Sequence, residues 1–266
     1  MRLPAPHADA HATGDRAGRR VTGITPIWPA AGAALGEEEL AEAYAPDQPD
    51  TVRVNFVTSV DGAVTLEGYS EGLSGPADKL IFGVLRMRCD ALLVGAGTLR
   101  HEGYGAVRLN ERRRAWRAAR GMAPYPTLVV VSRSLALDPA QGAFADAPVR
   151  PIVLTSASAP AHRRAALGEV AEVVTVGERD VDLAAGVDLL RERGLRHVLS
   201  EGGPQVFGAL TGADRVDELC LTVSPLLAGP GSARITAGAP GPPRALSLRH
   251  ALTAGGMLFL RYARSG

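Results

Sequence analysis

Two segments of the chain place glycines directly after a strongly apolar run, where the backbone can approach a ligand closely. The first is Gly-Ala-Gly-Thr at 95–98, and the second is Ser-Glu-Gly-Gly-Pro at 200–204. In the second segment Pro204 opens a helix candidate, and exposed N–H groups at a helix N-terminus favour a phosphate. Glu201 adds a carboxylate at the point where open α/β sheets place their ligands. Together these residues suggest binding of a phosphate-bearing cofactor beside a polar substrate.

Each of these segments also has a plainer interpretation. A glycine-rich strand end can be a simple turn, and Arg100 stands where the Rossmann fingerprint would need its third glycine. Glu201 can equally be a helix cap, because acidic residues stabilise helix starts. The residues alone leave both interpretations open.

Two further polar segments follow predicted strands. Ser132 and Arg133 combine a hydroxyl with a guanidinium, which can bind a phosphate monoester such as the 2′-phosphate that distinguishes NADPH from NADH. A solvated loop explains them equally well. The Thr-Ser-Val-Asp-Gly segment at 58–62 precedes a second polar, glycine-rich stretch at 68–72, and long loops of this kind often bind or cover a substrate.

Strand and helix patterns alternate from Thr51 onward. Short, almost uniformly apolar runs predict strands at 52–57, 91–94, 127–131, 151–154, 173–176, 197–199 and 218–223. Apolar residues at helical spacing predict helices that begin at Pro76, near Leu183 and near Pro204. The tail, 245–252 and 257–262 around Gly255-Gly256, predicts an antiparallel hairpin. The sequence therefore predicts an α/β fold with a mixed, mostly parallel sheet flanked by helices.

The remaining chain divides into three parts by composition. Residues 1–22 lack any periodic pattern and are predicted to be a disordered leader, while 23–50 should pack on the main domain as an extension, with an acidic helix at 37–44. Residues 51–266 form the main domain. Arg112, Arg113 and Arg114 are predicted to form a solvated helix face.

The totals exclude several classes of function. With 29 basic and 28 acidic side chains the formal net charge is +1, which does not favour nucleic acid or a membrane surface as a partner. The two cysteines are too few for a disulfide framework, so we expect a reduced, cytoplasmic setting. Neither the cysteines nor the six histidines have the spacing of metal ligands, so no metal is expected.

The order of the motifs resembles one known family. The chain carries, in this order, Ser-Val-Asp-Gly at 59–62, Ser70, Leu85-Arg86, the 90–98 segment, the strand ending at Ser132, Glu-Gly-Gly-Pro at 201–204, and the segments 216–219 and 224–229. This order resembles that in the reductase domain of bifunctional riboflavin deaminase-reductases and in stand-alone pyrimidine reductases, where the first motif is Ser-Leu-Asp-Gly. The resemblance covers about residues 51–262. It implies a dihydrofolate-reductase-like fold, a homodimer, and NADPH-dependent reduction of the ribose of a phosphoribosylamino-pyrimidine, such as 5-amino-6-(5-phosphoribosylamino)uracil, to a ribityl chain.

The resemblance also implies roles for individual residues. Glu201, Asp61 and Asn55 would lie at the reacting end, with Asp61 closing a loop beside the nicotinamide and Asn55 standing where bifunctional enzymes often carry lysine. Ser70, Arg86, Glu201 and Arg108 would face the substrate, with Arg86 on its phosphate and Glu201 on its amino groups. The residues implied for NADPH are Gly97, Thr98, Glu102, Ser132, Arg133, Gly202, Gly203, Pro204, Gln205, Val206 and Phe207.

Two other functions remain compatible with the same sequence. One is reduction of a different heterocycle, such as a dihydrofolate-like pterin, in the same cleft. The other is an NADPH-binding protein without catalysis, for which Asn55 and the Glu-Gly-Tyr segment at 102–104, in place of the family's Asp-Asp-Pro, are the motivating changes.

Overall fold

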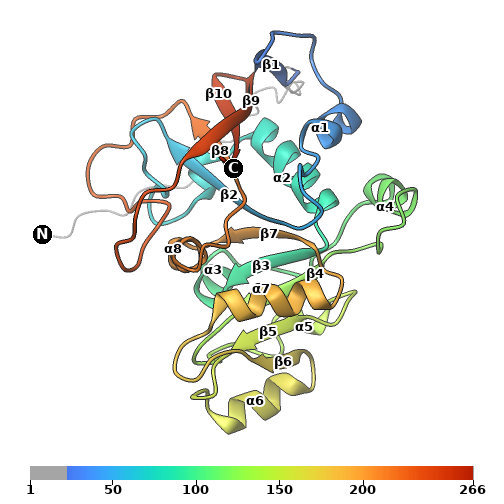
Figure 1. The fold of residues 1–266 in the computed structure, drawn as a ribbon, viewed down its shortest axis with the longest axis vertical. Helices are drawn as coiled ribbons and strands as arrows, with labels where there is room; N and C mark the ends of the chain where they lie inside the picture. Colours follow the sequence, from blue (N-terminus) through green and yellow to red (C-terminus); the bar gives the residue numbers. More distant parts are fainter. Residues whose placement is uncertain (1–22, 266) are drawn as a thin grey trace, which may run out of the picture.

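A ten-stranded mixed sheet forms the centre of the molecule (Figure 1). The computed structural model describes residues 23–265, so the leader predicted for 1–22 lies outside the described residues. The strands are β1 (Thr25–Trp28), β2 (Thr51–Ser59), β3 (Ala91–Gly95), β4 (Thr127–Val131), β5 (Ile152–Thr155), β6 (Glu172–Thr175), β7 (His197–Gly202), β8 (Glu218–Ser224), β9 (Leu246–Ala254) and β10 (Met257–Arg264). Their order across the sheet is β1-β9-β10-β8-β2-β7-β3-β4-β5-β6.

The sheet has a parallel part and an antiparallel part. From β8 through β2, β7, β3, β4 and β5 to β6, each neighbouring pair is parallel. From β8 through β10 and β9 to β1, each pair is antiparallel. The predicted fold class, the seven predicted strands and the antiparallel tail hairpin are therefore confirmed, whereas the sequence pattern missed β1 at the sheet edge.

Helices cover both faces of the sheet. They are α1 (Glu37–Ala43), α2 (Pro76–Arg88), α3 (Ala96–His101), α4 (Glu111–Ala118), α5 (Gly142–Ala145), α6 (Ala161–Gly168), α7 (Leu183–Glu192) and α8 (Pro204–Gly212), with a 3₁₀ turn, η1, at Glu71–Leu73. Within residues 23–265, none of these helices combines the length and apolar character that a membrane crossing requires.

Alternation along the strands creates two hydrophobic cores. In β3, Leu92 and Val94 contribute to the core that contains α2, whereas Ala91 and Leu93 contribute to the core beneath α7 and α8. A parallel strand that is buried on both faces needs apolar residues at successive positions. This explains why the sequence of β3 is a continuous apolar run.

Helix α2 packs on the sheet, and a side chain of α4 binds its C-terminal end. Pro76 occupies its first turn, and its apolar side chains are buried in the core shared with β3 and β7. At the C-terminal end the buried guanidinium of Arg117 donates from Nη1 to the carbonyls of Met87 (2.9 Å) and Cys89 (2.6 Å). These bonds satisfy carbonyl groups that the helix end leaves without intrahelical partners.

The arginine run on α4 is not entirely a solvated face, so that expectation is wrong for Arg113. Arg113 Nε donates to Glu37 Oε1 of α1 at 2.6 Å, and its side chain is 19% exposed. Its guanidinium lies against Gly83 of α2, where an added Cβ would come within 2.1 Å of Nη1. Arg112, in contrast, is well exposed. Both arginines pair with acidic residues of α1, so the packing of Arg113 against Gly83 distinguishes the two.

A buried cluster of charges joins the 23–50 segment to the sheet. Glu218 at the start of β8 accepts from Arg53 Nε of β2 at 2.7 Å and from Arg261 Nη2 of β10 at 2.7 Å. Arg261 Nη1 also donates to the carbonyl of Ala43 in α1 at 3.1 Å. Burial alone favours the neutral acid, but the two guanidinium charges outweigh it and hold the pKa of Glu218 below its usual value.

Replacement of Glu218 by glutamine should destabilise the fold strongly. The change leaves the buried Arg53 guanidinium without a compensating charge and Arg261 with Asp47 alone, and breaking buried pairs in this way typically costs about 3–5 kcal/mol. Urea unfolding of Glu218→Gln should show this loss in the free energy of unfolding. Glu172→Gln is the matched control, because Glu172 pairs with Arg193 at the surface, where such pairs contribute about 1 kcal/mol or less. Equal effects in the two variants would contradict this role for the buried cluster.

Candidate active site

A cavity of about 740 Å³ opens at the carboxyl ends of β2, β7 and β3. Its wall combines residues 55–57 of β2, the loop before α2, one face of α2, the start of α3, residues 104–107 and the junction of β7 with α8. Its volume lies in the usual range of small-molecule sites. Parallel strands bring their carboxyl ends to one edge of a sheet, which is why segments far apart in the sequence meet here.

The charged pair Arg86–Glu201 joins α2 to β7 at the cavity wall. Arg86 donates from Nε to Oε1 and from Nη2 to Oε2, each at 2.6 Å. The Glu201 side chain is 1% exposed and that of Arg86 is 24% exposed. The pairing register of β7 on β3 passes from Ser200 to Gly202, so a bulge falls at Glu201. Burial lowers the pKa of Arg86, but the Glu201 carboxylate outweighs this effect and raises that pKa above its usual value.

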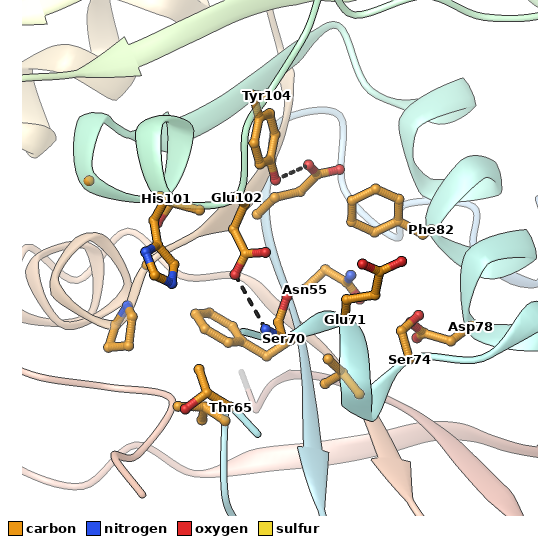
Figure 2. Close-up of a pocket in the computed structure, with 18 of the residues that line it drawn as sticks. Asn55, Thr65, Ser70, Glu71, Ser74, Asp78, Phe82, His101, Glu102 and Tyr104 are labelled. Carbon is orange, nitrogen blue, oxygen red and sulfur yellow. Dashed lines mark hydrogen bonds between the residues drawn. The ribbon is translucent and has the colours of Figure 1, made fainter. Parts of the chain in front are cut away.

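Tyr104 extends this pair into a group of three. Its hydroxyl donates to Glu201 Oε2 at 2.9 Å, the bond drawn as a dashed line in Figure 2. Burial and the neighbouring carboxylate raise the pKa of Tyr104, so its hydroxyl keeps its proton and remains a donor. The Arg86 guanidinium carbon also lies 4.2 Å from the ring centroid of Phe82, one helical turn earlier on α2.

Two helices begin side by side at the other part of the wall. Gly203, the residue before α8, has φ of 71°, a conformation that favours glycine, and an added Cβ would lie 2.6 Å from Thr98 Oγ1 of α3. Gly97, in the first turn of α3, lines the cavity, and a Cβ added there would meet no heavy atom within 4 Å. The start of α3 is therefore open at Gly97, whereas Thr98 fills the space beside Gly203. Both helix starts line the cavity, through Gly97 and Thr98 of α3 and through Gly203 and Pro204 at α8.

The loop before α2 is attached to the α3 segment. Glu102 Oε1 accepts from the Ser70 backbone N–H at 3.4 Å, and His101 Nε2 lies 2.8 Å from the carbonyl of Gly68. The His101 ring also stacks on Tyr69 with centroids 4.6 Å apart. These contacts place Ser70, Glu102 and His101 along one wall of the cavity (Figure 2).

The structure brings nine of the residues singled out from the sequence to this cavity. They are Asn55, Ser70, Arg86, Gly97, Thr98, Glu102, Glu201, Gly203 and Pro204. Glu201 already accepts three hydrogen bonds from Arg86 and Tyr104, and two of the Arg86 nitrogens are occupied by Glu201.

Asp61 lies outside the cavity lining and closes a loop. It accepts from the hydroxyl of Ser59 and from the backbone N–H groups of Ala228 (3.1 Å) and Gly229 (2.8 Å). These hydrogen bonds, led by that from Ser59, lower the pKa of Asp61 to about 2. The side chain therefore ties the end of β2 to the segment that follows β8.

Other singled-out residues also lie beyond the cavity wall. Ser132 is buried after β4 and accepts from the Leu135 N–H, while Arg133 forms an exposed ion pair with Asp180 at 2.9 Å. Arg108 donates to the carbonyl of Asp146. The remaining four are the neighbours of the α8 start, Gly202, Gln205, Val206 and Phe207, of which Val206 and Phe207 bury their side chains in the core beneath α8.

The sequence pattern alone misses several cavity residues. In the sequence, Tyr104 is notable only because Glu-Gly-Tyr at 102–104 replaces the Asp-Asp-Pro of the family. Nothing in the sequence pattern marked Asp78 or Phe82 as cavity residues. Asp78, Phe82 and Arg86 recur at intervals of four residues, so they form one row on α2. That spacing is a signal the sequence does contain. In residues 23–265, no group of three or more His, Cys, Asp or Glu side chains is arranged to hold a metal ion.

Comparison with known proteins identifies the family of this fold and site. Residues 50–259 match the model of the RibD C-terminal domain. The chain belongs to the RibD C-terminal domain family. The match includes every strand of the parallel part of the sheet and all segments that line the cavity.

Individual relatives of the RibD C-terminal domain family agree with this assignment. A 2,5-diamino-6-ribosylamino-4(3H)-pyrimidinone 5′-phosphate reductase from Archaeoglobus fulgidus is 30% identical over 67% of this chain and 81% of its own length. The crystal structure of a pyrimidine reductase-like protein from Corynebacterium diphtheriae has a TM-score of 0.80 and 27% identity, and the match covers 87% of this chain and 100% of that one. A deaminase/5-amino-6-(5-phosphoribosylamino)uracil reductase from Thermotoga maritima, 20% identical with a TM-score of 0.63, shares the fold over 85% of this chain and 60% of its own.

Replacement of Gly203 by alanine should destabilise the protein by about 1–3 kcal/mol, because the residue adopts a backbone conformation that side chains rarely tolerate and its Cβ would meet Thr98. Gly97→Ala is the matched control. That glycine lies in a helix with open space around it, so alanine should leave stability unchanged or raise it by up to about 1 kcal/mol. The free energies of urea unfolding test both values. A tolerated Gly203→Ala would contradict the close approach of α3 and α8.

Proposed function

We propose that the protein is an NADPH-dependent pyrimidine reductase that converts the ribose of a phosphoribosylamino-pyrimidine to a ribityl chain. The observation that supports this best is the convergence of two accessible helix starts with the Arg86–Glu201–Tyr104 group at one cavity. Membership in the RibD C-terminal domain family supports an oxidoreductase of the riboflavin pathway.

The cavity residues fit a dinucleotide phosphate. The first turn of α8 offers N–H groups next to Gly203, which lines the cavity and whose lack of a side chain leaves room for the Thr98 hydroxyl. Thr98 and the open Gly97 would complete the cradle from α3. We assign the pyrophosphate to this place, with Pro204, Gln205, Val206 and Phe207 contributing backbone rather than side chains.

Ser132 and Arg133 are the candidates for the 2′-phosphate of NADPH. They follow β4, the neighbour of β3, at the same edge of the sheet as the cavity. The Arg133–Asp180 pair is exposed, and such pairs contribute about 1 kcal/mol or less, so a phosphate can compete for Arg133. This assignment predicts a preference for NADPH over NADH.

The substrate would occupy the part of the cavity between α2 and β2. Arg86 has one nitrogen, Nη1, that Glu201 does not engage, and it would contact the substrate phosphate. Ser70 and Asn55 line the same part. The archaeal relative is named for a 2,5-diamino-pyrimidinone, whereas our sequence-based expectation names the corresponding uracil, so both rings are candidates.

NADPH would supply the hydride, and the protein would supply orientation. Opening of the ribosylamine gives an imine, C1′ of which accepts the hydride while the imine nitrogen gains a proton. The fixed distance between the α3–α8 cradle and the Arg86–Glu201–Tyr104 group would hold the two reacting carbons near contact, which is the main catalytic contribution available here. Asp61 would hold the loop at the end of β2 in place. The homodimer implied by the family resemblance stays a prediction.

The direct test is oxidation of NADPH by the purified protein, followed by the absorbance of the reduced nicotinamide. We expect oxidation that requires 2,5-diamino-6-ribosylamino-4(3H)-pyrimidinone 5′-phosphate or 5-amino-6-(5-phosphoribosylamino)uracil, and slower oxidation of NADH. NADPH binding without turnover of either pyrimidine would contradict the proposal. Turnover of a dihydropterin in that case would indicate the alternative reductase, and no turnover at all would indicate a binding protein.

Glu201→Gln should abolish most pyrimidine turnover while NADPH affinity changes only a few-fold. Glutamine cannot accept both bonds from Arg86, so the guanidinium moves, and displacement of a positioning group by about 1 Å can cost about 100-fold in rate. Steady-state kinetics and NADPH titration measure the two effects separately. The surface variant Glu172→Gln should match the wild type in both. Unchanged turnover in Glu201→Gln would remove Glu201 from the site.

A further inference from the structure

A second buried carboxylate lines the cavity, and the mechanism proposed above does not use it. Asp78 lies in the first turn of α2 and is 7% exposed. Burial of a charged carboxylate is costly unless it is paired or hydrogen-bonded. Within residues 23–265, no lysine, arginine or histidine forms an ion pair with Asp78. Its negative charge is therefore available to a ligand.

Two hydroxyl groups hold this carboxylate in a fixed orientation. Thr222 Oγ1 of β8 donates to Oδ1 at 2.7 Å, and Ser74 Oγ donates to Oδ2 at 2.6 Å. Figure 2 shows Ser74 and Asp78 together on the α2 side of the cavity. Each carboxylate oxygen can accept two hydrogen bonds, so one acceptor site remains on each oxygen. The arrangement suits a ligand that presents two neighbouring N–H donors.

The position of Asp78 along α2 determines which part of a substrate it can reach. Asp78, Phe82 and Arg86 lie at four-residue intervals, so the two ends of the row are separated by about 12 Å along the helix axis. The Arg86 end contacts Glu201, which directly precedes the glycines assigned to the cofactor. Asp78 thus lies at the end of the cavity away from Glu201 and the helix starts assigned to the cofactor.

The chemistry of the substrate ring then selects one of two candidates. With the ribosylamino group at C6 directed to the reacting end, the ring turns its C2–N3 edge to the opposite end. In a 2-amino-4-oxopyrimidine that edge carries two adjacent donors, the 2-amino group and N3–H. In a uracil the N3–H lies between two carbonyl oxygens, one of which would face the carboxylate. A carboxylate accepts only, so it favours the first ring and repels the second.

We propose that Asp78 is the specificity-determining residue of this cavity and binds the 2-amino and N3–H donors of a 2-amino-4-oxopyrimidine ring. The substrate is accordingly a phosphoribosylamino-pyrimidine that has not been deaminated. This inference rests on the proposed reductase function. Pterins carry the same ring edge, so the experiment must separate the two sources.

The test compares kcat/KM of the wild type and Asp78→Asn for the diamino-pyrimidinone phosphate and the corresponding uracil. The wild type should prefer the diamino ring by about 100-fold, because a buried group built to bind a substrate N–H discriminates strongly against an analogue that lacks it. Asp78→Asn should lower kcat/KM for the diamino ring by about 100-fold and leave a preference of less than about 10-fold. A wild-type preference for uracil, or a ratio unchanged by the substitution, would overturn the proposal.

Two further variants separate recognition from folding. Thr222→Val keeps the volume and the Asp78 charge but removes the hydroxyl that orients Oδ1, so it should reduce the substrate preference in the same direction even if Asp78→Asn unfolds. Glu71→Gln removes an exposed carboxylate at the same cavity, which pairs with Lys79, and should leave the ratio of the two kcat/KM values unchanged. A ratio altered equally by Glu71→Gln would show that overall charge, not Asp78, selects the ring, and would overturn the proposal.

Equilibrium binding distinguishes failure of this inference from failure of the proposed function. The probes are 2-amino-6-(methylamino)pyrimidin-4(3H)-one and 6-(methylamino)uracil, titrated into the NADPH-saturated protein and Asp78→Asn. Tighter binding of the 2-amino probe that Asp78→Asn abolishes supports the role of Asp78 even if neither phosphate is reduced, and equal binding overturns it. Turnover of a dihydropterin, but of neither pyrimidine, would overturn the assigned substrate.

Discussion

The ion pair between Arg86 and Glu201 is the contact on which the geometry of the cavity depends. Glu201 is almost fully buried, and a buried carboxylate is tolerated only with a partner as well aligned as the bidentate guanidinium of Arg86. Because Glu201 precedes Gly202 and Gly203, the pair sets the distance between α2 and the start of α8. Tyr104 adds a third element through its bond to Glu201. The Glu201 carboxylate therefore connects the substrate side of the cavity, on α2, with the cofactor side, at the start of α8.

The sheet supplies the frame for this pair. Parallel strands β2, β7 and β3 end at one edge, and the bulge at Glu201 interrupts the regular register where the carboxylate meets α2. A second buried cluster joins β2, β8 and β10, where Glu218 pairs with Arg53 and Arg261, and it connects the sheet with the segment around Ala43. The two buried clusters therefore have different roles. The cluster around Glu201 shapes the cavity, and the cluster around Glu218 joins the N-terminal segment to the sheet.

Local sequence patterns predict the strands, and together with the family resemblance they single out nine of the residues that line the cavity. Strands such as β3 are buried on both faces, so their uninterrupted apolar runs are recognisable, and Thr98, Glu201 and Gly203 follow such runs directly. The edge strand β1 is short and contains proline, which edge strands tolerate, so its pattern is weak. Partners lie far away in sequence: Arg86 and Glu201 are 115 residues apart, and Asp78 and Thr222 are 144 apart. No periodic pattern encodes such pairings, because tertiary packing creates them.

In the proposed reaction the cavity holds the ribose carbon against the hydride donor. The most direct measurement uses NADPH that carries deuterium at the transferred position of the nicotinamide, with analysis of the product by mass spectrometry and NMR. We expect one deuterium atom per product molecule, located on C1′ of the ribityl chain and of a single stereochemistry. Deuterium on a ring carbon, or NADPH oxidation without deuterium in the product, would contradict it.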